Sequence, residues 1–420
     1  MASDQAMLHE QRSEQFTKLR DLLRGGSRCS ARQKDTLAAT RRMAELRGKL
    51  LLQAYSKEKH LAWVHVFVPC EILHALKIVP LNLEGFSSML STRNLSSDAM
   101  RVAEDDFVSP DSCSFLETSM GAMIADVLPA PDIVISTTRF CDSAPKIYYQ
   151  MSQHYKGSMN FTLDVPYRET PETIDYVAEQ LRAMVKKIEE HLGIAVKEEE
   201  LASAIENSNR ARGYFLKVNE LRRHRPTPMS GREAIDYAAM LADTWGSREL
   251  PAIYRLLYQE LKEKIVKEEW AVPGERHRIL WLHLRPYYTD DIFDFVESRS
   301  GAVVAFEEVN HIFWEEMDPG EPYLGLAKKL VKNCISSELQ HRLEVYERTI
   351  DQYGIDAVIL FYHKGCTSVC STIQMTKECM EKKGVSVLSL EGECIDKRQY
   401  APLPTKARIE AFLEMLEASH

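Results

Sequence analysis

The sequence lacks the segments that carry a chain into or across a membrane. Its first residues, MASDQA, are polar and do not have the basic-then-apolar order of a signal peptide. The most apolar window, residues 61–83, is interrupted by His65, Glu71, His74 and Lys77, so it is not the continuous apolar run of a spanning helix. We therefore expect a soluble, cytoplasmic protein that does not contact a membrane.

An excess of basic residues is also missing. The chain has 53 Lys and Arg against 62 Asp and Glu, which gives a net charge of −9. Because a nucleic-acid-binding protein needs basic side chains to neutralise phosphates, we expect no nucleic-acid partner. Hydrophobic residues make up 45% and charged residues 27%, as in an ordinary globular protein, and 420 residues suggest two or three domains.

Several short motifs are absent. The nine cysteines include no CxxC pair, which argues against a typical zinc site and a thioredoxin-like site. The closest pair is Cys366 and Cys370, about one helical turn apart. No glycine-rich dinucleotide fingerprint follows a predicted strand, and residues 320–328 lack the Gly-Lys-Ser/Thr ending of a phosphate loop. The chain therefore has no recognisable nucleotide site of its own.

Short apolar runs alternate with helical patterns in two parts of the chain. Strands are predicted first at residues 62–68, 78–83, 132–136 and 159–163, and again at 279–284, 302–307, 357–362 and 385–390. This alternation predicts an α/β fold with two doubly wound parallel-sheet lobes. We expect a helical N-terminal segment at 1–60, the first lobe at 61–170, a helical middle region at 171–270 and the second lobe at 271–420.

Most of the cysteines fall at predicted element ends. Four of them directly follow predicted strands, namely Cys70, Cys141, Cys366 and Cys394. Cys113 begins a predicted helix, and Cys334 lies between two predicted helices. Ligands of parallel sheets bind beyond the carboxyl ends of the strands. Cys29 and Cys379 are predicted to have no special role. Any single cysteine is more often a small buried apolar residue, so the prediction depends on the shared position.

Thiolates dispersed over several loops are typical of an iron–sulfur cluster. Three cysteines would suffice for one 4Fe–4S cluster with an open iron, and six could hold two clusters or a larger one. As the sixth ligand we favour Cys394, which follows a strand, over Cys370. For proton transfer we favour Glu71, next to Cys70, with His65 as a second candidate. The basic run at residues 222–225 is interpreted as a solvated helix end, the alternative being a contact to an anionic cofactor.

Several segments together resemble the 2-hydroxyacyl-CoA dehydratase / benzoyl-CoA reductase family. They are residues 67–75 (FVPCEILHA), 111–115 (DSCSF), 128–142, 356–366, 390–398 (LEGECIDKR) and 408–414 (RIEAFLE). The resemblance implies that Cys113, Cys141 and Cys366 bind a 4Fe–4S cluster. It also implies a separate ATP-hydrolysing iron–sulfur activator that supplies electrons, in keeping with the missing nucleotide motif.

The chain departs from the dehydratase pattern by its surplus of cysteines. With Cys70, Cys334 and Cys394 added, the set of six resembles the double-cubane branch of the family. That branch implies an 8Fe–9S cluster in a homodimeric reductase of small molecules, and this is the function that the sequence favours. The alternative is a 4Fe–4S subunit of a 2-hydroxyacyl-CoA dehydratase, which is a lyase, or of a benzoyl-CoA-type reductase. A dehydratase subunit would form a heterodimer.

Overall fold

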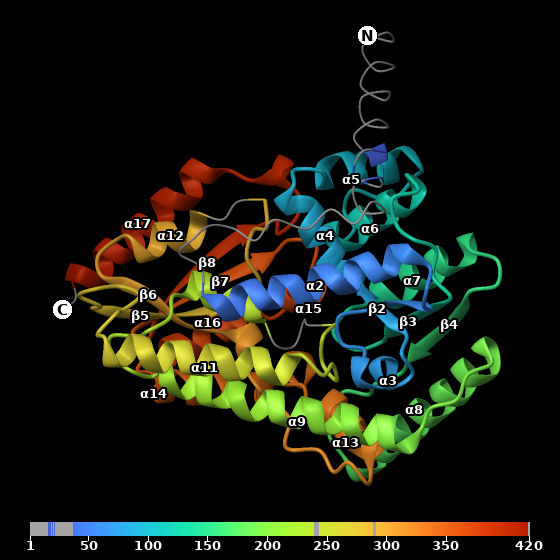
Figure 1. Cartoon of the computed structure of the whole chain (residues 1–420). Helices are drawn as coiled ribbons and strands as arrows, with labels where there is room; N and C mark the ends of the chain where they lie inside the picture. Colours follow the sequence, from blue (N-terminus) through green and yellow to red (C-terminus); the bar gives the residue numbers. More distant parts are fainter. Residues whose placement is uncertain are drawn as a thin grey trace, which may run out of the picture.

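The computed structural model describes residues 37–238, 243–288 and 291–418, together with Phe16, Thr17, Leu19 and Asp21. Most of the predicted N-terminal helical segment, and with it Cys29, lies outside the described residues. Within that segment the structure has helix α2 (Ala38–Ser56), which begins against helix α11 (Leu250–Val266) and runs toward strand β2 (Val79–Asn82) of the first lobe (Figure 1). None of the described helices is long and apolar enough to cross a membrane.

The described residues form two four-stranded sheets, and every pairing in them is parallel. The predicted α/β fold with two sheet lobes is thereby confirmed. The first sheet has the order β2-β1-β3-β4 and the second β6-β5-β7-β8. The strands are β1 (Leu61–Val64), β2 (Val79–Asn82), β3 (Ile133–Thr137), β4 (Met159–Leu163), β5 (His277–Leu282), β6 (Ala302–Glu307), β7 (Ala357–His363) and β8 (Ser386–Gly392).

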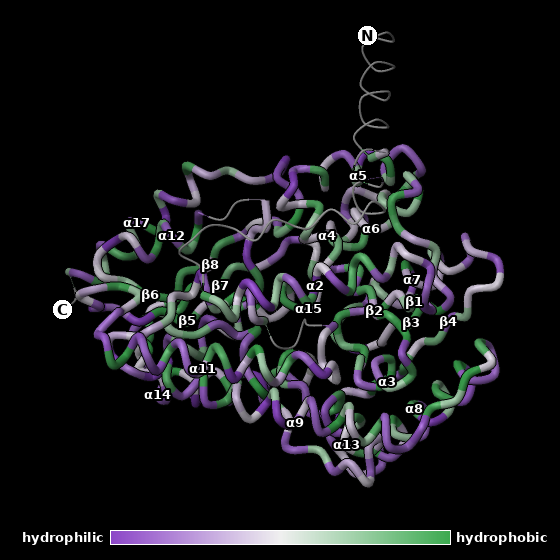
Figure 2. Tube along the Cα trace, viewed as in Figure 1, coloured by the Kyte–Doolittle hydropathy of each residue, from purple (hydrophilic) through white to green (hydrophobic). Residues whose placement is uncertain are grey.

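Successive residues of the central strands enter different cores on the two faces of each sheet. In β5, Ile279 and Trp281 pack in one cluster, and Leu280 and Leu282 in another. This explains why the strands are continuous apolar runs instead of alternating ones, because both faces are covered by helices. Figure 2 shows hydrophobic residues along the strands and a more mixed surface on the outer helices.

Helices connect the strands and cover the sheets. In the first lobe they are α3 (Cys70–Ala75), α4 (Leu83–Thr92), α5 (Ser96–Asp105), α6 (Ser114–Ile124) and α7 (Ala144–His154). In the second lobe they are α12 (Asp291–Glu297), α13 (Pro322–Val331), α14 (Leu339–Tyr353), α15 (Thr367–Cys370), α16 (Ile373–Lys382) and α17 (Pro402–Ala418). Of these, α13 packs instead on α8 of the middle region.

The middle region is helical, as predicted. Its long helices are α8 (Pro171–Leu192), α9 (Glu198–Leu221) and α11 (Leu250–Val266), with the short α10 (Gly231–Ala234) between the last two. Helices α9 and α11 lie side by side below both lobes, and α9 also packs on α3 of the first lobe (Figure 1). Because α10 packs on β6, the middle region contacts both lobes.

The end of α9 corrects the interpretation of the basic run. Arg222 is 1% exposed and forms a two-pronged ion pair with the fully buried Glu307 at the end of β6, with N–O distances of 2.9 and 2.7 Å. The interpretation of residues 222–225 as a solvated helix end is wrong for Arg222. The next residue, Arg223, does behave as predicted, because it pairs with Glu220 at the surface.

The strand order decides where a site can form. In both sheets the first strand of the lobe lies between the second and the third. In the first sheet the chain therefore leaves β1 toward β2 on one side and leaves β3 toward β4 on the other. The same holds for β5 and β7 in the second sheet. Such a reversal leaves a crevice at the carboxyl ends of the two central strands. A functional site is therefore expected among the residues that follow these strands.

Candidate functional site

Three of the predicted cysteine ligands line one cavity of about 450 Å³. Cys141 follows β3, Cys366 follows β7, and Cys113 immediately precedes α6. His65 after β1 and His283 after β5 line the same cavity. The carboxyl ends of the central strands of both sheets therefore contribute to a single cavity between the lobes, with thiols from each lobe.

Each of the three thiols stands close to the start of a helix. The backbone N–H of Ala144, at the start of α7, donates to the Cys141 sulfur at 3.3 Å. Cys113 and Cys366 are the N-cap residues of α6 and α15. Free N–H groups at helix starts favour negative charge, which is the state that a thiolate ligand requires.

Burial keeps these thiols protonated in the absence of a cation. It raises the pKa of Cys141 to about 11, raises that of Cys366 to about 12, and raises that of Cys113 well above its usual value. Mutual repulsion adds to the burial effect for Cys113 and Cys366, which face Cys141. A bound cation would offset this cost, because it would compensate the thiolate charges.

The chemistry of the three thiols is compatible with a cluster. Within the described residues, no group of three His, Cys, Asp or Glu side chains is arranged around one metal ion. In a 4Fe–4S cluster each thiolate binds a different iron, so the ligands stand farther apart and come from separate loops. Cys113, Cys141 and Cys366 come from separate loops and line the same cavity.

The loops of Cys113 and Cys366 touch through Gly365. A Cβ atom at position 365 would lie 2.9 Å from the Cα of Cys113 and 3.2 Å from the carbonyl oxygen of Ser112. Both contacts are to backbone, which cannot rotate away as a flexible side chain would. A glycine before Cys366 therefore allows the two thiol-bearing loops, one from each lobe, to approach.

Gly365→Ala is expected to separate these loops, lower the iron content after anaerobic reconstitution and cost about 1–3 kcal/mol of stability through overpacking. Gly213→Ala is the control, because no atom lies within 4 Å of a Cβ at that position in α9. The control should be neutral or slightly stabilising. Thermal unfolding and iron analysis measure both effects, and equal behaviour of the two variants would contradict the close approach at Gly365.

His363 links the same two lobes. Its Nε2 lies 3.4 Å from the Cys113 sulfur, and its Nδ1 lies 3.2 Å from Glu393. Glu393 also accepts a 2.7 Å hydrogen bond from the hydroxyl of Ser114. A buried carboxylate on the far side of a histidine orients the ring. His363 is therefore held with one nitrogen toward the sulfur of Cys113.

The other predicted cysteine ligands lie outside the cavity lining. Cys394 is fully buried, and its thiol is close enough to Cys113 and Cys366 to be affected by their charges. Cys370 donates to the carbonyl oxygen of His363 at 3.4 Å. Cys70 begins α3 and lines a separate cavity of about 30 Å³, and Cys334 is close to Glu308 and Arg342.

The two predicted proton-transfer residues have different positions. His65 lines the cavity, bonds Thr137 through Nδ1 at 2.8 Å and is neutral, because burial lowers its pKa to about 3. Glu71 does not line it; its carboxylate pairs with Lys329 at 2.7 Å and accepts from Ser208 at 2.9 Å. Burial alone would raise the pKa of Glu71, but Lys329 outweighs that effect and holds it below its usual value.

Glu84, which the sequence pattern did not single out, is one of five carboxyl side chains in the cavity lining, with Asp142, Asp236, Asp243 and Glu308. Burial raises its pKa to about 7, and it accepts hydrogen bonds from Tyr148 at 3.0 Å and from Asn82 at 3.0 Å. It lies 3.8 Å from Nε2 of His65. The sequence could have indicated Glu84, because it comes two residues after β2. The sequence pattern favours Glu71 instead, because it lies beside Cys70.

Comparison with known proteins gives a consistent set of relatives. Residues 65–416 match the family model described as 2-hydroxyglutaryl-CoA dehydratase, D-component. The alpha subunit of lactoyl-CoA dehydratase from Anaerotignum propionicum is 21% identical over 396 residues, covering 87% of this chain and 93% of the relative. The alpha subunit of (R)-phenyllactyl-CoA dehydratase from Clostridium sporogenes is 21% identical over 383 residues, covering 87% and 92%. A benzoyl-CoA reductase subunit from Thauera aromatica is 22% identical over 357 residues, covering 77% and 81%.

Proposed function

Because the chain belongs to the 2-hydroxyglutaryl-CoA dehydratase D-component family, we propose that it is the cluster-bearing subunit of an acyl-CoA dehydratase or reductase. Cys113, Cys141 and Cys366 would hold one 4Fe–4S cluster. The observation that carries the proposal is the convergence of these three thiols, from two lobes, on one cavity. When bound, such a cluster would supply low-potential electrons and an open iron as a Lewis acid.

The cavity suits the acyl end of a thioester. Its volume of about 450 Å³ is within the range of small-molecule sites. Aromatic side chains line it from both lobes, namely Phe67, Phe86, Phe115, Phe140 and Tyr287. These rings would exclude water from the reacting atoms, and His65 and Glu84 provide polar groups for orientation and proton transfer.

Glu84→Gln is expected to lower kcat by roughly 100-fold or more, because a positioned acid or base contributes that much to a proton transfer. As a general acid, Glu84 is protonated below about pH 7, so wild-type activity should fall as the pH rises through that value. The variant should lose this pH dependence. Steady-state kinetics across pH with 2-hydroxyacyl-CoA substrates measures both effects.

Glu71→Gln is the matched control for Glu84. It removes a carboxylate that pairs with Lys329 outside the cavity lining, so it should lower stability and leave the pH dependence near 7 intact. If instead the pH dependence disappeared in Glu71→Gln and persisted in Glu84→Gln, the acid would be Glu71, as the sequence alone favours.

Two observations support the proposed partners: the missing nucleotide motif and the description of the relatives as subunits. The chain contains no nucleotide motif, so the proposal includes a separate ATP-hydrolysing iron–sulfur activator as electron donor. The matched relatives are named as subunits, which supports a second, different subunit. A homodimer remains the prediction for the double-cubane alternative.

The double-cubane reductase is the second candidate. It is favoured by Cys394, which lies near Cys113 and Cys366, and by Val66 and Phe67, which line both the main cavity and the small cavity of Cys70. Iron and sulfide analysis after anaerobic purification separates the candidates, with about four irons per chain for one cluster and about eight for the double cubane. Almost no iron after anaerobic reconstitution would contradict both.

A further inference from the structure

A second pocket, of about 430 Å³, lies on the other side of α2 from the cysteine cavity. We call it the α2–α9 pocket. Leu46, Lys49, Leu50 and Gln53 of α2 face it, whereas Arg47, Gly48 and Leu51 line the cysteine cavity. Its other walls come from the end of α3, from α9 and from residues 246–249. It is therefore a separate site, although it shares a wall with the first.

Cationic side chains outnumber carboxylates in this pocket. Lys49, Lys59, Lys77 and Arg248 stand against Glu200 and Glu249, which leaves two positive charges in excess, on a chain whose net charge is −9. Glu200 is shared between Lys77 at 3.4 Å and Arg248 at 3.2 Å, and Glu249 pairs with Lys49 at 2.7 Å. No interaction of Lys59 is found among the described residues. The surplus positive charge favours an anionic ligand.

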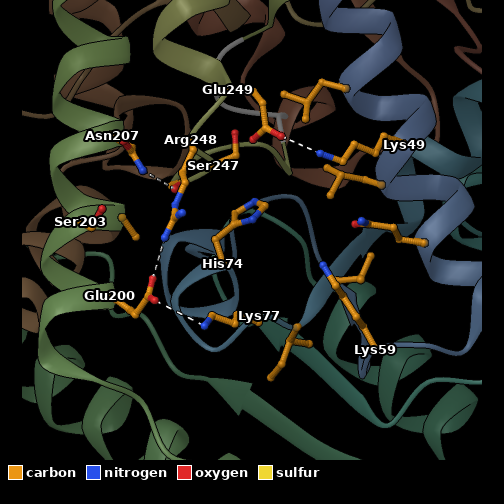
Figure 3. A pocket seen from close by; sticks show the side chains of 17 residues that line it. Lys49, Lys59, His74, Lys77, Glu200, Ser203, Asn207, Ser247, Arg248 and Glu249 are labelled. Atoms are coloured by element: carbon orange, nitrogen blue, oxygen red, sulfur yellow. Dashed lines mark hydrogen bonds and ion pairs between the residues drawn. The ribbon is translucent and has the colours of Figure 1, made fainter.

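Polar groups in the floor of the pocket are available to a ligand. The Ser247 residue is 6% exposed, and its hydroxyl has no hydrogen-bond partner among the described residues. A buried hydroxyl without a partner costs free energy unless something binds it. Figure 3 shows the ring of His74 in the middle of the pocket, between the Lys49–Glu249 pair and the group of Glu200, Lys77 and Arg248.

His74 offers an acceptor to the ligand. Its Nε2 lies 2.9 Å from the carbonyl oxygen of Asp243, which can only accept, so the ring proton is on Nε2. Burial lowers the pKa of His74, so the ring stays neutral and Nδ1 carries a lone pair. A ligand hydroxyl could donate to Nδ1, while its anionic group lies against the lysines and the arginine.

We propose that the α2–α9 pocket binds a small phosphate monoester that carries hydroxyl groups, such as a sugar phosphate or a nucleoside monophosphate. The phosphate dianion would be held by Lys59, Lys77 and Arg248, and the hydroxyls by His74 and Ser247. An Arg and Lys pair suits a phosphate because both charge and multiple acceptor oxygens are matched. The proposal goes beyond the cluster function and does not depend on it.

Isothermal titration calorimetry on the full chain tests the site with ribose 5-phosphate, AMP, inorganic phosphate and uncharged ribose. At least one ester is expected to bind, more tightly than inorganic phosphate, and ribose should not bind. Absence of binding by both esters would overturn the proposal. Inorganic phosphate binding as tightly as the esters would also overturn it, because the body of the ligand would then not be recognised.

Variants locate the binding. Arg248→Gln should weaken ester binding by about tenfold, as expected for the loss of a charge-assisted hydrogen bond, and Ser247→Ala should weaken it less. Lys186→Gln is the matched control, because it removes one positive charge from an exposed position on α8 where the pairing with Glu190 is at 4.0 Å. Equal weakening in Lys186→Gln and Arg248→Gln would place the binding elsewhere. Cys366→Ser, which tests the cluster, should leave ester binding unchanged.

Discussion

Cys366→Ser is expected to yield a folded chain that retains little iron after anaerobic purification. Its activity is expected to be more than about 100-fold lower than that of the wild type. Loss of a directly bound ligand should exceed the roughly 10- to 100-fold cost known for groups that only orient ligands. Cys113→Ser and Cys141→Ser should behave alike, because all three thiols line the same cavity. Iron and sulfide analysis, visible absorbance and kinetics measure these losses.

Cys379→Ser is the control for this series. Cys379 lies within α16, outside the cavity lining, with its sulfur beside Glu347, so iron content and activity should remain at wild-type values. Cys70→Ser and Cys334→Ser distinguish the two cluster types. Full iron retention in both variants is expected for one 4Fe–4S cluster, whereas halved iron in either would favour the double cubane.

Arg222→Met is expected to reduce the free energy of unfolding by about 3–5 kcal/mol, because it leaves the carboxylate of Glu307 buried without its partner. Arg222 and Glu307 are 1% and 0% exposed, and the pair joins the end of α9 to the end of β6. Arg223→Met is the neighbouring control. Its surface pair with Glu220 should contribute less than about 1 kcal/mol.

Thermal and denaturant unfolding compare these variants directly. A double variant, Arg222→Met with Glu307→Leu, should recover part of the lost stability, because no uncompensated charge remains buried. Similar losses of unfolding free energy in Arg222→Met and Arg223→Met would contradict this prediction. The buried ion pair at the end of α9 would then contribute no more to stability than a surface pair.

The strand pattern is readable from sequence because of its physical origin. A parallel sheet covered by helices on both faces requires continuous apolar runs, and each of the eight predicted runs overlaps a strand of the structure in its described residues. The prediction for the first run is too long. Residues 62–68 are apolar almost throughout, but β1 ends at Val64, so Cys70 begins a helix instead of directly following a strand.

Residues with similar sequence signals have different surroundings in the structure. The pattern places both Cys70 and Cys141 after a strand, yet only Cys141 lines the main cavity. The start of α3 instead packs toward residues 244–249, where a Cβ on Gly246 would lie 2.7 Å from the Cα of Glu71. This tight packing, together with Lys329, holds Glu71 outside the lining of the cavity.

The sequence by itself determined the two α/β lobes, the helical middle and the thiols placed at element ends, because periodicity and turns are local properties. Only the tertiary structure decided which thiols share a cavity, that Glu84 faces it in place of Glu71, and that Arg222 is buried. These depend on strand order and on how one lobe packs against the other. Gly365 beside Cys113 and Arg222 beside Glu307 are contacts between segments far apart in the chain, and no local pattern records them.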